Sequence, residues 1–598
     1  MQNIQRVSDR IAEILSENGI KKVFMVTGGG SMHLNDALSK NKALDVINMH
    51  HEQSCSMAAE GYARVNNEVA CVNVTTGPGG INAINGVFGA WTDSVPMIVV
   101  SGQVKRETLN PNSSKLRQLG DQENDIVSMV KKITKFSYLL KDPNQVDSVF
   151  STAIKVANSG RKGPVWIDVP IDVQGAEYNK SNQIKIKQVQ EIKLKNPSNK
   201  EVNEILKLLN NADRPAIIAG GGVRLSGAYK EFINFVESTN IPVLTAWNSH
   251  DLLHNKHKNY AGRPGTVGDR AGNFIAENCD LLLILGSRLN IRQIGYNYKS
   301  FSSNSYKIMV DIDKEELNKN TLNIDLKLNY DLKIFLKTMN KFSNKISNKN
   351  HKSYLSWCKS LNKKFPVFQE KFRKSNKINP YLFVNQLFRF TDKKSVVVTS
   401  DGTAVVSTFQ GAIIKKGQRL FSNSGSASMG FGLPASIGAC FANQNNQIIC
   451  IEGDGSLQMN IQELATVKMH ELPIKIFVLS NEGYHSIRQT QSKYFPENIV
   501  GCGPDSGLFF PKLSHIAKGY GIDYIKVNKS LKLNETLDKV FNFNGPIICE
   551  VVLDKNQEFE PKASSKLYHD GSMKSAPLYD LYPFLDEQVV QEIINYKN

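Results

Sequence analysis

Short apolar runs alternate with helix-like segments along most of this 598-residue chain, and this alternation constrains the fold more than any other feature. Strands that alternate with helices build parallel sheets with helices packed on both faces. The sequence therefore predicts an α/β protein in which each domain is a mostly parallel sheet. Four of these runs are 22-KVFMVTGGG-30, 70-ACVNVTTGPGG-80, 96-PMIVVSGQ-103 and 164-PVWIDVP-170.

The chain is too long for one hydrophobic core, so several domains are expected. Two polar stretches rich in Lys and Asn, at 176–200 and around 341–354, interrupt the alternation. We interpret both as linkers or surface helices. The predicted divisions are 1–175, 195–338 and 375–560, followed by a tail over 561–598.

The composition is typical of a soluble globular protein, with 41% hydrophobic and 22% charged residues. Lys and Arg number 73 against 56 Asp and Glu, which gives a net charge of +17. A solvated Lys-rich surface accounts for this charge, and steering of anionic substrates or cofactors is the functional alternative. No basic block is interleaved with aromatic residues, so nucleic-acid binding is not expected.

The eight cysteines are scattered without a C-x-x-C pair, and several lie in apolar runs. Cysteine in such runs is usually a small buried residue, which fits a reducing compartment. The N-terminus lacks the continuous apolar segment of a signal peptide. Apolar runs such as 281-LLLIL-285 are strand-sized and too short to span a membrane. These features predict a cytoplasmic protein.

Two predicted strands each end in a small polar residue beside glycine, within 449-ICIEGDGSLQMNIQELATVKMHELPIKIFVLSNEGYHSIRQ-489. Ligands of open parallel sheets bind beyond the carboxyl ends of the strands, so Asp454 and Asn481 should be neighbours. Their oxygens and a backbone carbonyl suit Mg²⁺ or Ca²⁺ rather than Zn²⁺. A bound diphosphate would complete a Mg²⁺ shell, with Gly453 and Gly455 allowing close approach and the following helix directing its first amides at the anion.

A single Gly-Asp-Gly is more often only a turn, but the second polar strand end, about one βαβ unit later, strengthens the pattern. Together they resemble the diphosphate motif of the thiamine diphosphate enzymes. That resemblance implies that Asp454, Asn481 and the carbonyl oxygen of Gly483 bind Mg²⁺. It implies diphosphate-binding roles for Gly453, Gly455 and Ser456.

The segment 47-INMHHEQSCSMAAEGYAR-64 is similar to the family's R-H-E-x-x-A-x-x-x-A-x-G-Y-A-R pattern. The resemblance implies that Glu52 is the catalytic carboxylate that drives the aminopyrimidine of the cofactor into its imino form. Without the resemblance, Glu52 would be interpreted as a partner for the helix dipole. For His50 and His51 a packing role is at least as well supported.

Other parts of the active site follow from the same resemblance. In 422-SNSGSASMGFGLPASIGA-439, Met429 matches the bulky apolar residue that separates the two cofactor rings, although alone it would be interpreted as a core residue. The segment 75-TTGPGGINAINGVFGAWTDSVPMIVVSGQ-103 follows at the family spacing, and its Asn82 is implied to bind the cofactor. Gln122 and the backbone near Gly29 are implied to line the substrate side.

Within that family the chain is most similar to the acetolactate synthase catalytic subunits, over nearly its whole length. This implies a pyrimidine-binding domain, a central Rossmann-like domain and a diphosphate-binding domain, in that order. It also implies a homodimer or homotetramer with active sites at subunit interfaces. Four central segments match those that hold a structural FAD, namely 216-AIIAGGG-222, 262-GRPGT-266, 286-GSRLNIR-292 and 309-MVDIDKEE-316. The residues implied to bind FAD are Gly220, Gly221, Gly222, Arg288, Arg292, Asp311 and Asp313.

Several positions depart from the acetolactate synthase pattern. Asp121 replaces an aromatic residue before Gln122, and Thr490 aligns with a Trp that sizes the acceptor pocket. The Gln-His pair that opens the diphosphate domain is absent from 399-TSDGTAVVS-407. Loss of a hydrophobic wall admits larger and more polar acceptors. Arg292 aligns with the arginine that holds the carboxylate of the second keto acid, and its fork suits a carboxylate or a phosphate.

The resemblance implies a carboligase that uses thiamine diphosphate and Mg²⁺. It would decarboxylate pyruvate or a similar 2-keto acid and transfer the two-carbon unit to a second 2-keto acid. Transfer to a keto-sugar nucleotide, in surface-polysaccharide synthesis, is the alternative that the altered wall and the tail 572-SMKSAPLYDLYPFL-585 motivate. A non-catalytic protein of the same fold is a third reading, against which Glu52, Asp454 and Asn481 argue.

Overall fold

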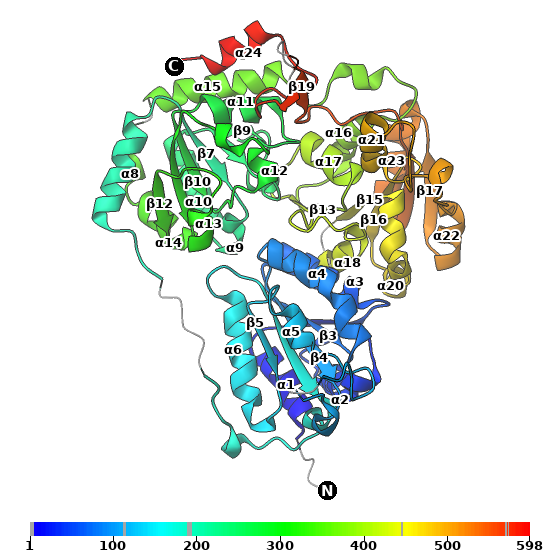
Figure 1. Ribbon diagram of the computed structural model, residues 1–598. Coiled ribbons are helices and arrows are strands. Elements are labelled where there is room, and N and C mark those ends of the chain that lie inside the picture. The colour runs from blue at the N-terminus through cyan, green and yellow to red at the C-terminus, as the bar shows by residue number, and fades with distance from the viewer. Residues whose placement is uncertain are drawn as a thin grey trace.

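The structure is a computed structural model that describes residues 5–111, 115–187, 194–347, 349–443, 447–567, 571 and 573–597. Across these residues the chain forms three parallel sheets of six strands each, flanked by helices, and a small antiparallel hairpin. The sheets are separate along the sequence and lie in three lobes (Figure 1). The predicted α/β class is confirmed, while the exact domain limits stay predictions.

The N-terminal sheet has the strand order β2-β1-β3-β4-β6-β5 and carries helices on both faces (blue to cyan in Figure 1). Its strands are β1 (Lys22–Met25), β2 (Asp45–Asn48), β3 (Ala70–Val74), β4 (Met97–Gln103), β5 (Phe136–Leu139) and β6 (Pro164–Pro170). Its helices are α1 (Val7–Glu17), α2 (Met32–Lys40), α3 (Glu52–Asn66), α4 (Pro78–Thr92), α5 (Ile126–Val130), α6 (Val146–Asn158) and α7 (Ile171–Gln174).

The central sheet has the order β12-β11-β10-β7-β8-β9. Its strands are β7 (Pro215–Ala219), β8 (Val243–Thr245), β9 (Tyr260–Gly262), β10 (Leu281–Leu285), β11 (Tyr306–Asp311) and β12 (Leu326–Asn329). Its helices are α8 (Asn199–Asn211), α9 (Gly222–Leu225), α10 (Tyr229–Thr239), α11 (Arg270–Asn278), α12 (Ile291–Ile294), α13 (Lys314–Asn318), α14 (Leu332–Asn340) and α15 (Lys349–Lys364).

The C-terminal sheet has the order β14-β13-β15-β16-β18-β17. Its strands are β13 (Val396–Thr399), β14 (Arg419–Phe421), β15 (Ile448–Gly453), β16 (Ile474–Ser480), β17 (Asp523–Val527) and β18 (Ile547–Val552). Its helices are α16 (Pro380–Phe390), α17 (Thr403–Gly411), α18 (Gly432–Ala442), α19 (Asp454–Leu457), α20 (Leu464–Met469), α21 (His485–Tyr494), α22 (Leu513–Tyr520) and α23 (Leu533–Asn542).

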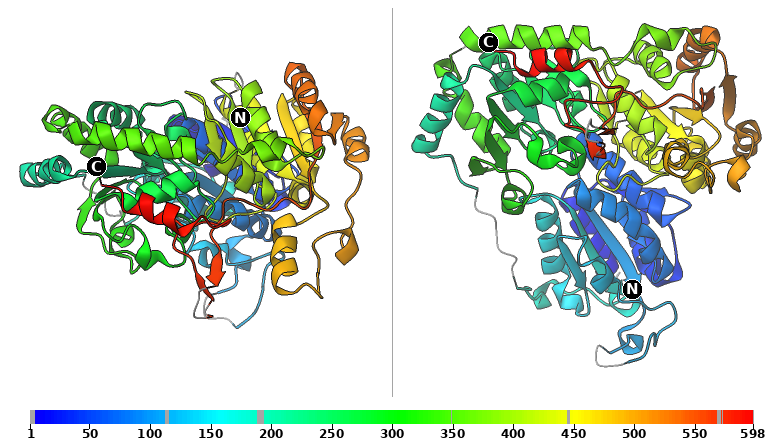
Figure 2. Two further views of the ribbon diagram at one scale, coloured as in Figure 1. Left: turned by 90° about the horizontal axis from the view of Figure 1, so that it is seen from above. Right: turned by 45° about the horizontal axis from the view of Figure 1, so that its top comes forward.

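The tail returns from the C-terminal sheet to the central one. It carries β19 (Ser565–Leu567), β20 (Met573–Ser575) and α24 (Glu587–Ile594), and α24 lies beside α11 and α15 (Figure 2). The ring of Tyr596 stacks on Trp357 of α15 at 4.3 Å between centroids. No helix among the described residues combines the length and the apolar composition that a membrane crossing needs.

The N-terminal and C-terminal lobes meet where α3 crosses α18, and small residues make the crossing close. A Cβ atom on Gly438 would lie 1.8 Å from the carbonyl oxygen of Ala58, and one on Gly61 would lie 2.1 Å from that of Ala435. Real Cβ atoms do not approach so closely, so glycine is required at both positions. Backbone-to-backbone contact therefore fixes how the two lobes are placed.

Asn248 of the central lobe joins all three lobes. Its amide nitrogen donates to Asp93 of the N-terminal lobe, and to the Ser422 carbonyl and Ser424 hydroxyl of the C-terminal lobe. Its side-chain oxygen accepts the Ser422 N–H at 3.0 Å. Asn248 has a left-handed φ of 62°, which asparagine tolerates better than most residues.

Candidate active site

Asp454 holds two loops of the C-terminal sheet together. Gly453 pairs in register with Leu479, so β15 and β16 end side by side. One carboxylate oxygen of Asp454 accepts the N–H groups of Asn481 at 3.0 Å and Gly483 at 3.1 Å, and the other accepts that of Gly455 at 2.9 Å. The predicted proximity of Asp454 and Asn481 is confirmed. Burial raises the pKa of the Asp454 carboxyl to about 6, and the backbone donors oppose that rise.

The oxygen atoms at this loop fit a hard divalent cation. The Asn481 amide nitrogen donates to the Thr403 hydroxyl at 3.2 Å, so the amide oxygen is the atom that a cation would take. Arg488 donates to the carbonyls of Asn481 and Glu482 and fixes the turn. The described residues hold no cluster of three or more His, Cys, Asp or Glu side chains that suits a metal. One carboxylate plus neutral oxygens is what Mg²⁺ accepts when phosphate supplies other ligands.

The glycines of the Gly-Asp-Gly turn differ in their surroundings. A Cβ on Gly453 would meet only Ser456, at 3.9 Å, so this position can admit close approach. A Cβ on Gly455 would lie 2.3 Å from the ring of Tyr484, so Gly455 is needed for packing within the protein. The helix begins at Asp454, two residues earlier than expected, and its α-helical part ends at Leu457 before a 3₁₀ segment. The expectation of a regular helix after Gly455 is corrected accordingly.

The turn that carries Met429 is bonded to the segment 453–456, which is predicted to bind diphosphate and which we call the diphosphate loop. The Gly430 N–H donates to the Ser456 hydroxyl at 2.8 Å, and Ser456 also bonds the Ser400 hydroxyl at 2.6 Å. The buried carboxylate of Glu452 accepts the Leu433 N–H at the start of α18. The turn that carries Met429 is therefore bonded directly to Ser456 of the Gly-Asp-Gly segment.

Glu52 begins α3 and is 9% exposed. Asn82 of α4 donates its amide to the Glu52 carboxylate at 3.0 Å, and a Cβ on Gly79 would lie 3.4 Å from the other carboxylate oxygen. His51 is the helix N-cap, since its Nδ1 accepts the Gln53 N–H. The protein therefore holds a carboxylate in a mostly buried position, with one amide donor and a small residue beside it.

Gly29 and Gln122, which are predicted to line the substrate side, lie at the carboxyl edge of the N-terminal sheet. Gly29 follows β1, and the space around it is open, since a Cβ there would meet nothing within 4 Å. Gln122 is exposed with a left-handed φ of 63°. The carbonyl oxygen of Gln122 would lie 2.4 Å from a Cβ on Gly77, the residue before α4. The Gln122 loop is therefore seated against the start of the helix that carries Asn82.

A buried aspartate supports the Gln122 loop. Asp168 of β6 accepts the Ser101 hydroxyl at 2.5 Å and the Gln103 amide at 2.9 Å. Gln103 also donates to the carbonyl of Asn124, two residues from Gln122. We did not predict this role, although a lone Asp within the apolar run 164-PVWIDVP-170 was the available signal.

Substitution Asp168→Asn is expected to change the pH dependence of stability. Burial raises the pKa of Asp168 from 3.8 to about 7. The pKa of Asp168 is higher in the folded than in the unfolded protein, so the proton on its carboxyl stabilises the folded state. This stabilisation is fully present below about pH 4 and is lost as the pH rises to about 7. The full contribution of the proton to the free energy of unfolding is on the order of 2–4 kcal/mol. The melting temperature of the variant minus that of wild type should therefore be more positive at pH 8 than at pH 5. A pH-independent difference would contradict this assignment.

Asn460 and Glu463 connect the N-terminal and C-terminal lobes of one chain. The Asn460 side-chain oxygen accepts the Ser54 hydroxyl at 3.1 Å, and its nitrogen donates to the Gly430 carbonyl at 2.8 Å. Glu463 accepts the His50 N–H at 3.2 Å. The first turn of α3, which carries Glu52, is thereby joined to the turn that carries Met429.

A cavity of about 670 Å³ lies where the three lobes meet. Of the residues predicted to bind FAD, those that line it are Gly220, Gly221, Gly222, Arg288 and Asp311. Arg292 and Asp313 are not among the described residues that line it. The Arg292 guanidinium lies 5.5 Å from the centre of the Trp247 ring, and Asp313 caps α13 by accepting the Glu315 N–H.

The cavity wall has features that suit a dinucleotide. Gly220 and Gly222 are required because a Cβ on either would lie within 2.7 Å of Gly286 atoms, whereas Gly221 would meet only the Ser249 hydroxyl, at 4.0 Å. The Ser249 hydroxyl and the Trp247 indole N–H are both buried, and neither has a hydrogen-bond partner among the residues that the structure describes. An open glycine turn beside two unpaired polar groups fits a ligand with phosphate and ring polar atoms.

The sequence matches three descriptions of one family. These are "Thiamine pyrophosphate enzyme, N-terminal TPP binding domain" over residues 5–129, "Thiamine pyrophosphate enzyme, central domain" over 202–339, and "Thiamine pyrophosphate enzyme, C-terminal TPP binding domain" over 392–551. The chain belongs to the thiamine pyrophosphate enzyme family.

Within that family the chain is an enzyme that depends on thiamine diphosphate and resembles acetolactate synthases. It is 31% identical to the chloroplastic acetolactate synthase of Arabidopsis thaliana over 570 residues, which cover 93% of this chain and 83% of the relative. It is 31% identical to the acetolactate synthase large subunit of Cyanidium caldarium over 562 residues, covering 92% and 94%. The large subunit of Lactococcus lactis subsp. lactis is 30% identical over 566 residues, covering 94% and 95%.

Proposed function

We propose that this protein is a carboligase that decarboxylates pyruvate or a similar 2-keto acid and transfers the two-carbon unit to a second 2-keto acid. The observation that carries the proposal is the nearly buried Glu52 carboxylate, held by the amide of Asn82 at the start of α3. The acetolactate synthases named above supply the reaction class by similarity.

Bound thiamine diphosphate would supply a thiazolium that accepts the electron pair released by decarboxylation. Glu52 would hold a proton at the pyrimidine ring nitrogen and so set the protonation state of that ring. Asp454, Asn481 and the carbonyl of Gly483 would hold Mg²⁺ and, through it, the diphosphate. Met429 would hold the two rings in the bent arrangement, and Gln122 and Gly29 would border the substrate.

The acceptor in this proposal is a second 2-keto acid. The relatives named above carry the acetolactate synthase name, and the keto-sugar alternative is not favoured by them. Thr490 occupies the exposed face of α21, and its hydroxyl donates to the Ser486 carbonyl at 3.0 Å. A hydroxyl already bonded to its own helix gives no added reason to expect a sugar.

Incubation of the purified enzyme with pyruvate, thiamine diphosphate and Mg²⁺ tests this function. We expect acetolactate to accumulate and CO₂ to be released, with both lost when Mg²⁺ is chelated. The matched control omits thiamine diphosphate after the protein has been stripped of cofactor. Turnover that begins only when a nucleotide-linked ketose is added would contradict the proposed acceptor.

We also propose that the cavity between the lobes binds FAD as a structural group. Gly221, the unpaired Ser249 hydroxyl and the unpaired Trp247 N–H support this assignment. The proposed reaction involves no net oxidation or reduction, so the flavin would act by filling and rigidifying the junction of the lobes.

The active unit that we propose is a homodimer or homotetramer. Ile81 and Phe88 of α4 are 46% and 41% exposed, and Met459 beside the diphosphate loop is 46% exposed. Exposed apolar side chains near a functional site commonly mark a protein interface. A second copy of the chain would cover them and complete the site. The cytoplasmic location stays a prediction from the sequence.

A further inference from the structure

A second cavity, of about 420 Å³, lies beside the returning tail. It is lined by Arg270 at the start of α11, by part of the segment 364–371 at and after the end of α15, and by residues 560–561 and 583–585. Its volume falls within the range of small-molecule sites. The residues predicted for the active site and for FAD binding, all of which the structure describes, are not among those that line it.

Arg270 brings a buried positive charge to this cavity. The residue is only 9% exposed, and its guanidinium donates to the carbonyl of Leu581 at 2.9 Å and to that of Pro583. The carboxylate of the preceding residue, Asp269, is engaged with backbone N–H groups. A guanidinium has five N–H donors, so two carbonyls leave donors over. The carbonyls accept hydrogen bonds, but they carry no charge that would balance Arg270.

The acids nearest to Arg270 already have partners. Burial lowers the pKa of Arg270, and the charges of Asp580 and Glu560 oppose that change. Asp580 binds Lys566 at 3.0 Å, and Glu560 binds Lys371 at 2.9 Å. Within the part of the chain that the structure describes, no carboxylate lies within ion-pair distance of Arg270. A buried charge without a partner is costly, and arginine is rarely so buried unless it is paired. The guanidinium therefore lacks a counter-ion.

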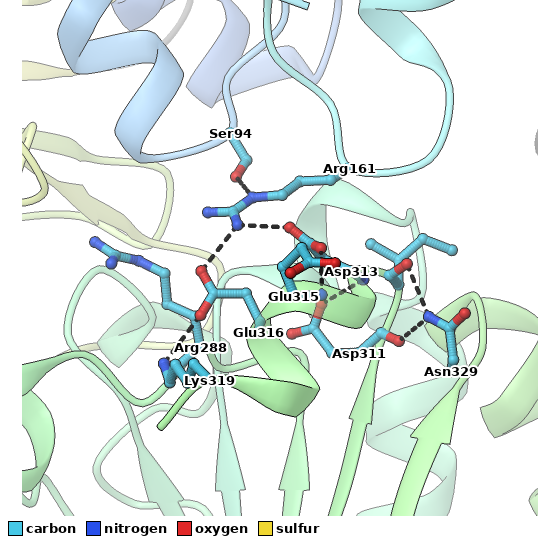
Figure 3. Close-up of polar contacts among 10 residues, drawn as sticks. Ser94, Arg161, Arg288, Asp311, Asp313, Glu315, Glu316, Lys319 and Asn329 are labelled. Carbon is cyan, nitrogen blue, oxygen red and sulfur yellow. Dashed lines mark hydrogen bonds and ion pairs between the residues drawn. The ribbon is translucent and has the colours of Figure 1, made fainter. Parts of the chain in front are cut away.

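Two other arginines at contacts between lobes have their charge offset. Arg161 is shared between the carboxylates of Asp313 and Glu316 (Figure 3). Arg263 donates to three carbonyls at the C-terminal end of α17, where the helix dipole favours a cation. Arg270 is instead the first residue of α11, and the dipole at that end of a helix does not favour a cation. The comparison indicates that Arg270 is prepared for an anion that the chain does not supply.

The rest of the cavity lining is basic in part and apolar in part. Lys364 and Lys371 line it with Arg270, and Glu560, the acid among the described lining residues, is paired with Lys371. The apolar lining consists of Phe365, Pro366, Val367, Pro561, Pro583, Phe584 and Leu585. An anion with an apolar body could therefore place its charge at Arg270 and bury its body against this lining.

We propose that this cavity is a second ligand site, separate from the active site, which binds a small organic acid with its carboxylate at Arg270 and its apolar body against residues 365–367 and Phe584. The bound acid would touch the central lobe and the tail together and so hold the tail in place. Inorganic phosphate suits a guanidinium as well, but it would leave the apolar lining uncovered. This inference depends neither on the carboligase reaction nor on FAD.

Calorimetric titration of the purified protein with isocaproate tests the site. Isocaproate is a carboxylate with a branched apolar body, and it has no keto group that could react in the active site. We expect saturable binding, and we expect the neutral isocaproamide to bind about 10- to 150-fold more weakly, the range that loss of a hydrogen bond to a charged group gives. Acetate, which lacks the apolar body, and inorganic phosphate should both bind more weakly than isocaproate.

Two variants change the site in different ways. Arg270→Gln removes the charge but keeps an amide that can donate to a tail carbonyl, and its affinity for isocaproate should fall about 10- to 150-fold. Val367→Trp keeps Arg270 and its bonds but fills the cavity, so it should also lose isocaproate binding, even where Arg270→Gln loosens the tail. Arg10→Gln is the matched control, since Arg10 pairs with three acids of the N-terminal lobe. It should bind isocaproate as wild type does.

Several results would overturn the proposal. It fails if wild type does not bind isocaproate, if isocaproamide binds as tightly, or if Arg270→Gln and Val367→Trp both keep wild-type affinity. It also fails if phosphate binds more tightly than isocaproate, because the apolar lining then plays no part, or if Arg10→Gln loses as much affinity as Arg270→Gln. Release of CO₂ from pyruvate is measured separately for every variant and reports on the carboligase, whatever the result with isocaproate.

Discussion

Substitution Glu52→Gln is expected to lower CO₂ release from pyruvate by about 100- to 10,000-fold, the usual contribution of a positioned acid–base group. Glutamine keeps the shape of the side chain and can still accept the Asn82 amide at its oxygen, but it cannot hold a mobile proton at the cofactor ring. Thiamine diphosphate binding, followed by calorimetry, should remain within a few-fold of wild type because the diphosphate loop is unchanged.

The control for this variant is Glu68→Gln. Glu68 lies in the same lobe and accepts the hydroxyl of Tyr62, but it takes no part in the proposed site. It should retain wild-type turnover. Undiminished thiamine-dependent CO₂ release by Glu52→Gln would exclude the mechanism proposed for this residue.

Mixing Glu52→Gln with a second variant shows whether each active site is built by one chain or by two. When Glu52→Gln and Asp454→Ala are mixed under conditions that exchange subunits, sites formed across two chains give mixed dimers with one intact site. Activity should then return to about a quarter of wild type for random pairing in a symmetric dimer. Sites formed within one chain would give no recovery, because every chain then carries one defective half.

The parts of the structure that depend on the spacing of apolar and polar residues along the chain could be predicted from the sequence. The alternation of strands and helices gave the parallel sheets, and parallel strand ends brought Asp454 beside Asn481. Gly455 was predicted to allow close approach of a ligand, but the ring of Tyr484, which follows β16, occupies the space where a side chain of residue 455 would lie. A pattern can show that glycine is needed without showing which neighbour requires it.

Contacts between lobes could not be predicted in the same way. Asn248, Arg161 and Asn460 each bond residues more than a hundred positions away, so they leave no periodic signal in the sequence. Their burial and partners follow from how three separately folded sheets are docked. The resemblance to a family implied the order of the domains, but the residues that hold them together became visible only in the structure.

Substitution at the crossing of α3 and α18 is expected to lower the stability of the protein. In Gly438→Ala the new methyl group would lie 1.8 Å from the carbonyl oxygen of Ala58, so the helices must separate. Overpacking of this kind costs about 1–3 kcal/mol, and we expect the upper end because backbone atoms cannot rotate away. Alanine also favours a helix over glycine by about 1 kcal/mol, which offsets part of the cost.

Gly519→Ala is the control for this substitution. Gly519 lies within α22, and a Cβ there would meet nothing within 4 Å. This variant should gain up to about 1 kcal/mol from helix propensity alone. The midpoints of thermal and denaturant unfolding should therefore fall for Gly438→Ala and rise for Gly519→Ala.

Because α18 follows the Met429 turn directly, Gly438→Ala should also weaken thiamine diphosphate binding, whereas Gly519→Ala should not. Equal stability of the two variants would show that the lobes are not held by the close approach of these helices.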